Sequence, residues 1–334
     1  MITLKDIAKE AGVSIMTVSR VINQKYSEVS DENIEKINSI IHRLGYVPNS
    51  SARSLSSKSS RIISIIIQGD HNALEWPYNS SMLGYIISQV QQRGYNTMVH
   101  FISEYTDIIT HLQSWRAEGA IFLGVFDAYI KQIQDSNRIP LVFTDCYSSV
   151  RQLINIGIDD YKGGFLAARH FIENGHRDFA FVTLHTAMSQ LIQQRLKGFK
   201  DTIEKAGFHL DEDHIIEPWN MDETIQKLCT MKRPPTAIFA AADNTAVELV
   251  DRMKQKGCRV PEDFSVIGFD NLPMSGYISP RLTTISQDIM KKAHFAIDIL
   301  FQHINDPDLP MQSIILDVEL IDRESVQNLN MPQR

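Results

Sequence analysis

Residues 12–23 read GVSIMTVSRVIN, and their spacing is typical of a short amphipathic helix. At about 100° per residue, three apolar side chains fall on one side of such a helix: Val18, Val21 and Ile22. Met16 and Arg20 point almost directly away from them, with Thr17 and Ser19 on the flanks. An outward face that combines a guanidinium, two hydroxyls and a methionine predicts contact with a partner molecule.

The neighbouring residues make this helix the second of three. Thr3 can cap a first helix, with Asp6 three positions later, and Gly12 permits a turn before Ser14 caps the helix quoted above. A third helix is expected over residues 31–44, with Ile34, Ile37, Ile40, Ile41 and Leu44 buried. A helix, a turn of about four residues and a second helix form a helix-turn-helix, whose second helix enters the DNA major groove.

The outward side chains match the chemistry of DNA recognition. Arg20 can donate two hydrogen bonds to a guanine, and Met16 and Ile15 can contact thymine methyl groups. Three hydroxyls can bind phosphates: those of Ser14, Thr17 and Ser19. The alternative is a small helical bundle with an ordinary solvated face, because the spacing by itself is only moderately specific.

A serine-rich segment, YVPNSSARSLSSKSSR at 46–61, follows the third helix. Asn49 can cap a helix over 50–56 that is too short to be stable alone. Its apolar residues Ala52 and Leu55 suggest a hinge helix that folds on DNA and wedges into the minor groove. The alternative is a flexible linker whose Leu55 packs on the body.

Charge is distributed unevenly between the two ends of this 334-residue chain. The net charge is −7, yet residues 1–61 hold nine basic and six acidic side chains, a local charge of +3 that leaves −10 for the remainder. A mildly basic head on an acidic body permits phosphate binding at one end.

The rest of the composition excludes several classes of protein. Apolar content of 43% is ordinary for a globular protein, and no run of about 18 uncharged apolar residues indicates a membrane helix. The charged start MITLKDIAKE is unlike a signal peptide, so we expect a cytoplasmic protein. Three widely spaced cysteines, Cys146, Cys229 and Cys258, are interpreted as reduced, packed thiols. The spacing of His170 and His176 fits no zinc template, so no metal site or cofactor is expected.

From Ile62 onward, short apolar runs alternate with amphipathic helices, among them 84–94 and 165–175. The runs are interpreted as buried parallel strands at 62–68, 97–101, 120–124, 141–145, 179–184, 236–241 and 264–269. Two consecutive βαβ series predict an α/β body of two doubly wound parallel sheets, with ligands at the carboxyl ends of the strands. No GxGxxG or GxxxxGK[ST] motif is present, and Gly163–Gly164 is interpreted as a close-packing device.

Polar residues just beyond strand ends are the candidates for a ligand cleft. They are Asp145, Asp243, Asp270 and, early in a helix, Arg195. Carboxylates that accept hydrogen bonds from hydroxyls, with an arginine that donates back, suit sugar recognition. Three aromatic residues could add stacking surface: Trp76, Tyr78 and Trp219. Taken singly, a strand-end aspartate is as often a helix cap.

The segments TLKDIAKEAGVS-x-x-TVSRVIN and RLGYVPNSSARSL together resemble the head and hinge of the lactose/galactose-repressor family of bacterial transcription regulators. The resemblance continues along essentially the whole chain. It implies that Ile15, Met16 and Arg20 read bases, and that Ala52 and Leu55 enter the minor groove at a central CG step. It also implies backbone contacts for Thr3, Ser14, Thr17, Ser19, Asn23, Tyr46 and Asn49.

For the body, the same resemblance implies a periplasmic-binding-protein-like fold with an effector between two subdomains. Arg195, Asp270 and Gln287 match effector-binding positions, and Asp145 is similarly placed. Two departures leave the ligand open: Ala242 replaces a usual Asn or Ser, and Trp76-Pro77-Tyr78 replaces a more usual Pro-Phe-Phe-like run.

The implied organisation is a head and hinge over residues 1–58 and a body over 60–334. The body would divide into an N-subdomain (about 60–158 plus 289–316) and a C-subdomain (about 159–287 plus 317–334). The crossings are expected near 157–159, 287–288 and 317–318. A heptad tail is absent, so a dimer is expected rather than a tetramer.

These features favour a dimeric repressor of a carbohydrate-utilisation operon. We expect it to bind a pseudo-palindromic operator in double-stranded DNA, under control of a sugar or sugar phosphate. A solute-binding protein of periplasmic type would share the body, but the DNA-binding head argues against it. An α/β enzyme is a third class, which no catalytic triad, metal cluster or phosphate loop supports.

Overall fold

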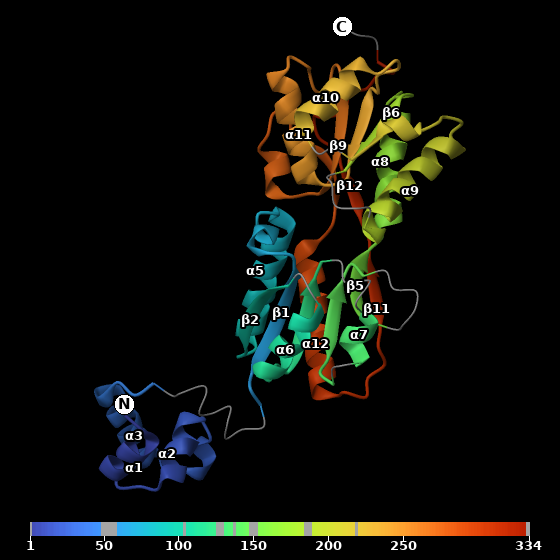
Figure 1. Cartoon of the computed structure of the whole chain (residues 1–334). Coiled ribbons are helices and arrows are strands. Elements are labelled where there is room, and N and C mark those ends of the chain that lie inside the picture. Colours follow the sequence, from blue (N-terminus) through green and yellow to red (C-terminus); the bar gives the residue numbers. More distant parts are fainter. Residues whose placement is uncertain are drawn as a thin grey trace. The chain divides into compact units, whose positions relative to one another are not determined.

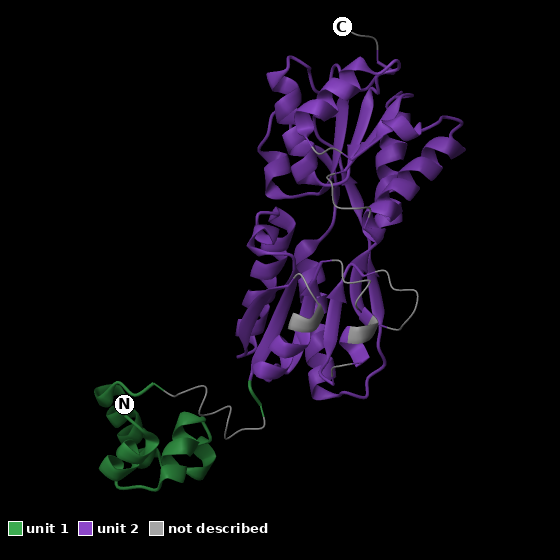
Figure 2. Ribbon diagram, in the orientation of Figure 1, with its two compact units in different colours: residues 1–60 green, residues 61–334 purple. Residues whose placement is uncertain are grey.

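The computed structural model divides the chain into two compact units, residues 1–60 and 61–334 (Figure 2). The structure describes residues 2–47, 59–102, 105–124, 130–135, 138–146, 153–183, 189–217 and 220–331. Four predicted site residues therefore lie outside the described residues: Asn49, Ala52, Leu55 and Trp219. Within the described ranges, no helix has the length and apolar character needed to cross a membrane.

The first unit contains the three predicted helices. They are α1 (Leu4–Ala11), α2 (Ile15–Ile22) and α3 (Asp31–Leu44), with a 3-10 turn η1 (Tyr26–Glu28) before α3. Thr3 and Asp6 form the predicted capping box, and the Ser14 hydroxyl accepts a hydrogen bond from the Thr17 amide at 3.0 Å. Gly12 and Gly45 end α1 and α3 in the left-handed conformation. The helix-turn-helix prediction is confirmed.

The core of this unit is small. It consists of Ile7, Ala8, Ala11, Val18, Val21, Ile37 and Ile40. Ile34, Ile41 and Leu44 were expected to be buried, but they are only partly buried at the edge of this cluster. Within the described part of this unit, α3 packs against α1 and α2, and a single stripe of its surface is fully covered.

The second unit contains two six-stranded sheets (Figure 1). The first has the order β11-β5-β4-β3-β1-β2 and is parallel throughout. Its strands are β1 (Ile62–Gln68), β2 (Asn96–Ile102), β3 (Gly119–Leu123), β4 (Leu141–Thr144), β5 (Ile154–Ile158) and β11 (Ser313–Leu316). Its helices are α5 (Pro77–Gln92), α6 (Tyr105–Ser114), α7 (Ile130–Asp135) and α12 (Ile289–Asn305), and the turn η2 (His71–Leu74) precedes α5.

The second sheet has the order β12-β10-β9-β8-β6-β7. Its strands are β6 (Phe179–Val182), β7 (Ile215–Ile216), β8 (Ala237–Ala240), β9 (Ser265–Asp270), β10 (Thr283–Ser286) and β12 (Glu319–Ile321). Its helices are α8 (Asp160–Glu173), α9 (Gln190–Lys205), α10 (Met221–Thr230) and α11 (Asp243–Gln255), with turns η3 (Glu212–His214) and η4 (Pro273–Gly276). The edge strand β12 runs antiparallel to β10, so this sheet departs from the purely parallel prediction.

Alternate residues of each sheet pack against helices on opposite faces. In the first sheet, Ile63 and Ile65 join the core shared with α5 and α12, whereas Ile66 joins the core shared with α6 and α7. In the second sheet, α8 and α9 cover one face and α10 and α11 cover the other (Figure 1). This arrangement confirms the doubly wound prediction.

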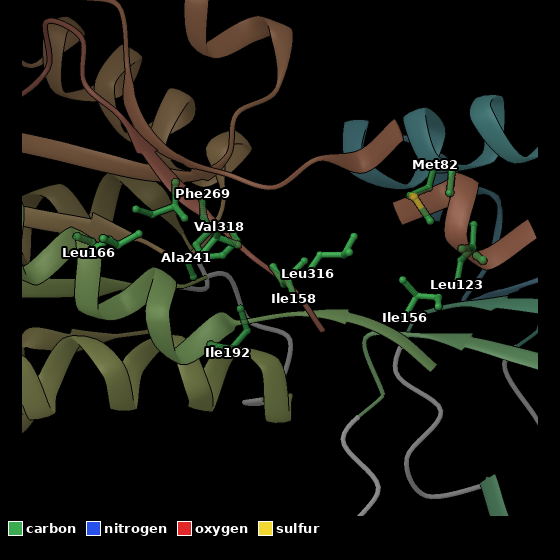
Figure 3. Close-up of a cluster of buried hydrophobic side chains, with 14 of the residues drawn as sticks. Met82, Leu123, Ile156, Ile158, Leu166, Ile192, Ala241, Phe269, Leu316 and Val318 are labelled. Carbon is green, nitrogen blue, oxygen red and sulfur yellow. The ribbon is translucent and has the colours of Figure 1, made fainter. Parts of the chain in front are cut away.

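The chain passes between the two sheets three times: after β5, between β10 and α12, and between β11 and β12. Ile158 and Leu316, which end β5 and β11, belong to one hydrophobic cluster with Met82 and Leu123 near the first sheet and Phe269 near the second (Figure 3). The crossing strands are thus packed together rather than solvated.

Two predictions about the second unit need correction. Helix α5 begins at Pro77, seven residues before the predicted 84–94 segment, because proline suits the first turn of a helix. Cys146 is buried as expected, but Cys229 is exposed. Although Cys229 and Cys258 are distant in sequence, their sulfur atoms lie 3.6 Å apart.

Candidate DNA-reading helix and ligand cavity

The outward face of α2 carries exposed apolar side chains. Ile15 is 48% exposed and Met16 is 64% exposed, whereas Val18 and Val21 on the opposite face are buried. Exposed apolar side chains at the start of the second helix of a helix-turn-helix lie where such proteins contact base edges. The structure therefore brings together the residues expected to read bases.

Arg20 lies on the same face and forms an ion pair within the first unit. Its Nε donates to Glu28 of η1 at 2.8 Å, and both side chains remain partly exposed. An exposed ion pair of this kind is weak, so it leaves Arg20 available to another acceptor.

The hydroxyls expected to touch phosphates already have partners. Thr3 donates to Asp6 at 2.7 Å, Ser14 and Thr17 lie 2.9 Å apart, and the Asn23 amide donates to Ser19 at 3.2 Å. Tyr46 is half-buried against the core of the unit. These contacts fix the start of α1 and both ends of α2.

A cavity of about 640 Å³ lies in the second unit. Its lining combines residues that follow strands of both sheets. Six of the predicted effector residues line it: Trp76, Tyr78, Asp145, Arg195, Asp270 and Gln287. The expectation that these side chains meet at one cleft therefore agrees with their placement.

Arg195 of α9 is held rigidly at this cavity. Its Nε donates to Asp160 at 2.7 Å, its Nη1 donates to the Ala241 carbonyl at 2.6 Å, and its guanidinium lies 3.5 Å from the centre of the Phe269 ring. Burial alone would lower the pKa of Arg195, but the carboxylates of Asp160 and Asp270 raise it above its ordinary value. Arg195 is thus a permanent, oriented cation.

Two glycines allow α9 to approach α8 closely enough for this geometry. A Cβ on Gly164 would lie 2.0 Å from the Arg195 carbonyl oxygen, and a Cβ on Gly198 would lie 1.9 Å from that of Tyr161. Both contacts are with backbone atoms, which cannot move aside as a flexible side chain can. Gly163 and Gly164 serve close packing, as predicted, and their effect extends to the position of Arg195.

Asp270 ends β9 with a φ of 115°, a backbone conformation that is costly for any residue except glycine. Its carboxylate accepts a hydrogen bond from Gln287 at 2.5 Å. Burial raises the pKa of Asp270 to about 6, although Arg195 opposes the shift. Asp145 also has a positive φ, 57°, so both cavity carboxylates lie on strained backbone, as is common at binding sites.

Two residues of this network, Lys292 and Asp160, were not predicted from the sequence. The Lys292 ammonium lies 2.5 Å from both oxygens of Asp145 and 3.3 Å from Gln287, and the Tyr78 hydroxyl donates to Asp145 at 2.9 Å. Burial, reinforced by the Asp145 carboxylate, raises the pKa of Tyr78 well above its ordinary value. Lys292 is completely buried. A usable signal was present, because Lys292 shares the apolar stripe of α12 with Ala296 and Ile299.

Asp243 does not line the cavity, contrary to its assignment from the sequence. It is completely buried, and its oxygens accept from the Leu272 amide at 2.7 Å and the Thr284 hydroxyl at 2.5 Å. Burial, reinforced by Asp270, raises the pKa of Asp243 to about 8. Asp243 thus fastens the segment after β9, while its neighbour Ala242 lines the cavity.

The Trp76-Pro77-Tyr78 run forms one wall of the cavity, as its sequence position suggested. Trp76 is the residue before α5 and remains 38% exposed, with its neighbour Pro77 as the first residue of the helix. An exposed indole at a cavity wall offers an apolar face to a ligand.

Comparison with known proteins supports both halves of this description. Residues 3–49 match the family described as bacterial regulatory proteins, lacI family, and residues 168–326 match a periplasmic binding protein-like domain. The HTH-type transcriptional repressor PurR of Vibrio atlanticus (strain LGP32) is 31% identical over 99% of this chain and 100% of its own length. The ribose operon repressor of Haemophilus influenzae is 29% identical over 98% of this chain and 100% of its own length.

Solved structures of two other regulators share the fold of this chain. The lac repressor dimer bound to operator and the anti-inducer ONPF superposes with a TM-score of 0.83, at 26% identity over 98% of this chain and 99% of that one. The complex of the transcriptional regulator CelR with cellobiose shares the fold, with a TM-score of 0.71 at 24% identity over 97% and 100% of the two chains.

A helix-turn-helix with an exposed second helix, two doubly wound sheets around a cavity, and full-length similarity to repressors all point to the same family. The chain belongs to the lacI family of bacterial regulatory proteins and is a DNA-binding transcriptional repressor with a ligand-binding body.

Proposed function

We propose that this repressor controls a carbohydrate-utilisation operon and that a sugar in the 640 Å³ cavity sets its affinity for the operator. The observation that carries the proposal is the convergence of Arg195, Asp270 and Gln287 on one cavity with Trp76 at its wall. Carboxylate, amide and guanidinium groups pair with hydroxyls in both directions, and an indole covers the apolar face of a sugar ring.

Two structural relatives are solved with carbohydrates, CelR with cellobiose and a regulator from Enterococcus faecium with ribose. Their identities to this chain, 24% in both cases, support the fold, and the choice of ligand rests on the cavity itself. The proposed ligand-binding residues are Trp76, Tyr78, Asp145, Arg195, Asp270 and Gln287, with Trp219 retained from the sequence prediction. Asp243 is not among the proposed ligand-binding residues, because it does not line the cavity.

In the head, we propose that Arg20, Met16 and Ile15 read base edges. Thr3, Ser14, Thr17, Ser19, Asn23 and Tyr46 are the proposed backbone contacts. Asn49, Ala52 and Leu55 remain predictions from the sequence. The domain boundaries given above, residues 1–58 for the head and hinge and 60–334 for the body, are part of the same proposal.

We propose that the repressor works in the cytoplasm. We also propose that it is a homodimer, because a two-fold symmetric protein matches a pseudo-palindromic operator. Its function is regulatory rather than enzymatic. A ligand bound between the two sheets would favour one arrangement of the sheets and their helices over another. A difference of a few kcal/mol in its affinity for the two arrangements is enough to shift the equilibrium between them.

Thermal unfolding of the full chain tests this proposal. The panel contains monosaccharides, disaccharides, sugar phosphates and purines. A ligand at about 100 times its dissociation constant should add roughly 2.7 kcal/mol of stability, which is visible as a raised midpoint. In Arg195→Ala the same ligand should raise the midpoint by far less, because its oriented donor is gone.

Since Arg195→Ala also removes the ion pair with Asp160, the ligand-induced shift is compared rather than the midpoint itself. Arg169→Ala is the matched control, because Arg169 is a half-exposed arginine of α8 that contacts Glu173 and Phe165 of its own helix. An equal shift in wild type and Arg195→Ala would place the ligand elsewhere.

A further inference from the structure

The ion pair between Lys292 and Asp145 adds a charged element to the ligand cavity. Lys292 is completely buried and reaches Asp145 from α12, 147 residues away in the sequence. Through Gln287 the contacts continue to Asp270, since the Gln287 side chain touches the Lys292 ammonium at 3.3 Å and donates to Asp270 at 2.5 Å. A buried ammonium therefore shapes the charge of the cavity wall.

Around this cavity, both cations that the described residues supply are paired with carboxylates. Lys292 pairs with Asp145, and Arg195 pairs with Asp160. Asp270 adds a third carboxylate, which the Arg195 and Lys292 charges stabilise from a distance. Carboxylates thus outnumber cations, and each cation would have to leave a buried partner to bind an anion.

Two of the three guanidinium nitrogens of Arg195 also have acceptors in the protein. Its Nε and Nη1 already donate to Asp160 and to the Ala241 carbonyl. A phosphate group prefers two parallel donors of a guanidinium, and the Nε–Nη2 side of Arg195 does not offer them because its Nε already donates to Asp160. Moving an anion into a buried site without such donors is costly.

We infer that the Lys292–Asp145 ion pair determines specificity: because Asp145 holds the Lys292 ammonium, the cavity accepts uncharged polyhydroxylated ligands and excludes their phosphate esters. This inference rests on the proposed function, because it names the ligand class of that same cavity. Hydroxyls can donate to Asp145 and Asp270 without disturbing either ion pair. The phosphorylated sugars that the sequence leaves open are the class that the charge balance disfavours.

The variant Asp145→Asn tests the inference directly. It keeps the size of the side chain and a hydrogen-bond acceptor for Tyr78, but it removes the carboxylate that is ion-paired with the Lys292 ammonium. Inorganic phosphate should then stabilise the full-length variant at concentrations at least tenfold lower than wild type requires, at matched ionic strength. The double variant Asp145→Asn/Lys292→Met, which has no ammonium, should respond like wild type.

Because all three proteins have the same head, phosphate bound there cancels from the comparison. Equal responses of wild type, Asp145→Asn and the double variant would overturn the inference. If Asp145→Asn does not fold, wild type still decides, with ribose against ribose 5-phosphate and glucose against glucose 6-phosphate as probes. Tighter binding of either ester than of its parent sugar overturns the inference, and binding of the esters at least tenfold weaker supports it.

Failure of the proposed function can be distinguished from failure of this inference. If no sugar on the panel stabilises wild type, the carbohydrate proposal fails. The phosphate response of Asp145→Asn still reports on Lys292, because it requires no sugar.

Discussion

The head and the body present their functional side chains in opposite ways. In the head, Ile15 and Met16 are neighbours in sequence and are largely exposed. In the body, Arg195, Asp270 and Gln287 come from separate elements and are each 6% exposed. A DNA groove is a large, regular surface that a protruding helix can enter, whereas a small ligand must be enclosed by groups that are already oriented. Substitutions should therefore damage the two units in different ways.

The largest effect is expected from Gly164→Ala, which should destabilise the second unit by about 3 kcal/mol or more. The added methyl group would collide with the Arg195 backbone, so α8 and α9 must separate and Arg195 must move. Urea unfolding measures the loss. Gly84→Ala in α5 is the control, because nothing lies within 4 Å of its Cβ, and it should stabilise the protein by about 0.5–1 kcal/mol. Equal stability of Gly164→Ala and wild type would show that the two helices are not in backbone contact.

In the head, by contrast, substitution should change recognition rather than folding. Arg20→Ala should cost about 1–3 kcal/mol at one base pair of each half-site and relax the preference there. Selection of binding sites from random duplex DNA, followed by affinity measurements on single-base variants, reads this out. Glu28→Gln is the control, because it removes the partner of Arg20 but keeps the guanidinium, so base preference should persist. Equal loss of affinity on every sequence would assign Arg20 to phosphates.

A smaller effect, a dependence of stability on pH, is expected from the buried carboxylates of the body and not from the exposed side chains of the head. Because the native pKa of Asp243 is about 8 and its ordinary value is 3.8, the folded state holds a proton that the unfolded state releases. Stability should therefore fall as pH rises through this range, with a slope of up to about 1.4 kcal/mol per pH unit. Asp270 adds to this slope only below about pH 6, and His176, whose pKa burial lowers to about 4, opposes it only below about pH 6.5.

Chemical denaturation between pH 6.5 and 8 isolates Asp243. Wild type should lose stability across this window and Asp243→Asn should show a flatter profile. Identical slopes for the two proteins would mean that Asp243 is ionised in the native state.

The head could be predicted in detail because its signals are local. The Thr3–Asp6 capping box, the Ser14 cap and the glycine at the end of α3 lie within one turn of what they terminate. Several strands of the body were also visible, since β1, β3 and β9 are runs of mostly buried residues. Five other strands were not predicted: β5, β7, β10, β11 and β12. The site residues that directly follow a buried strand could be predicted from the same pattern.

The contacts of the cavity could not be predicted because they depend on pairing between distant segments. Lys292 meets Asp145 because α12, which follows the second crossing, packs against the first sheet, and the position of Lys292 on an apolar stripe was the sole local sign. Asp243 and Asp270 both follow apolar runs. Asp270 lines the cavity, whereas Asp243 accepts hydrogen bonds from Leu272 and Thr284. Which of two strand-end carboxylates faces a ligand is decided by the loop that follows, and the sequence pattern does not encode that loop.

The most direct test of the account is the operator affinity of the full-length repressor with and without a sugar that raises its unfolding midpoint. Fluorescence anisotropy on a duplex selected from random DNA measures the dissociation constant. We expect the sugar to change it by about 5- to 150-fold in wild type, the usual range of coupling between sites, and by much less in Arg195→Ala. A sugar that binds wild type in the cavity and leaves the operator dissociation constant unchanged would contradict the account.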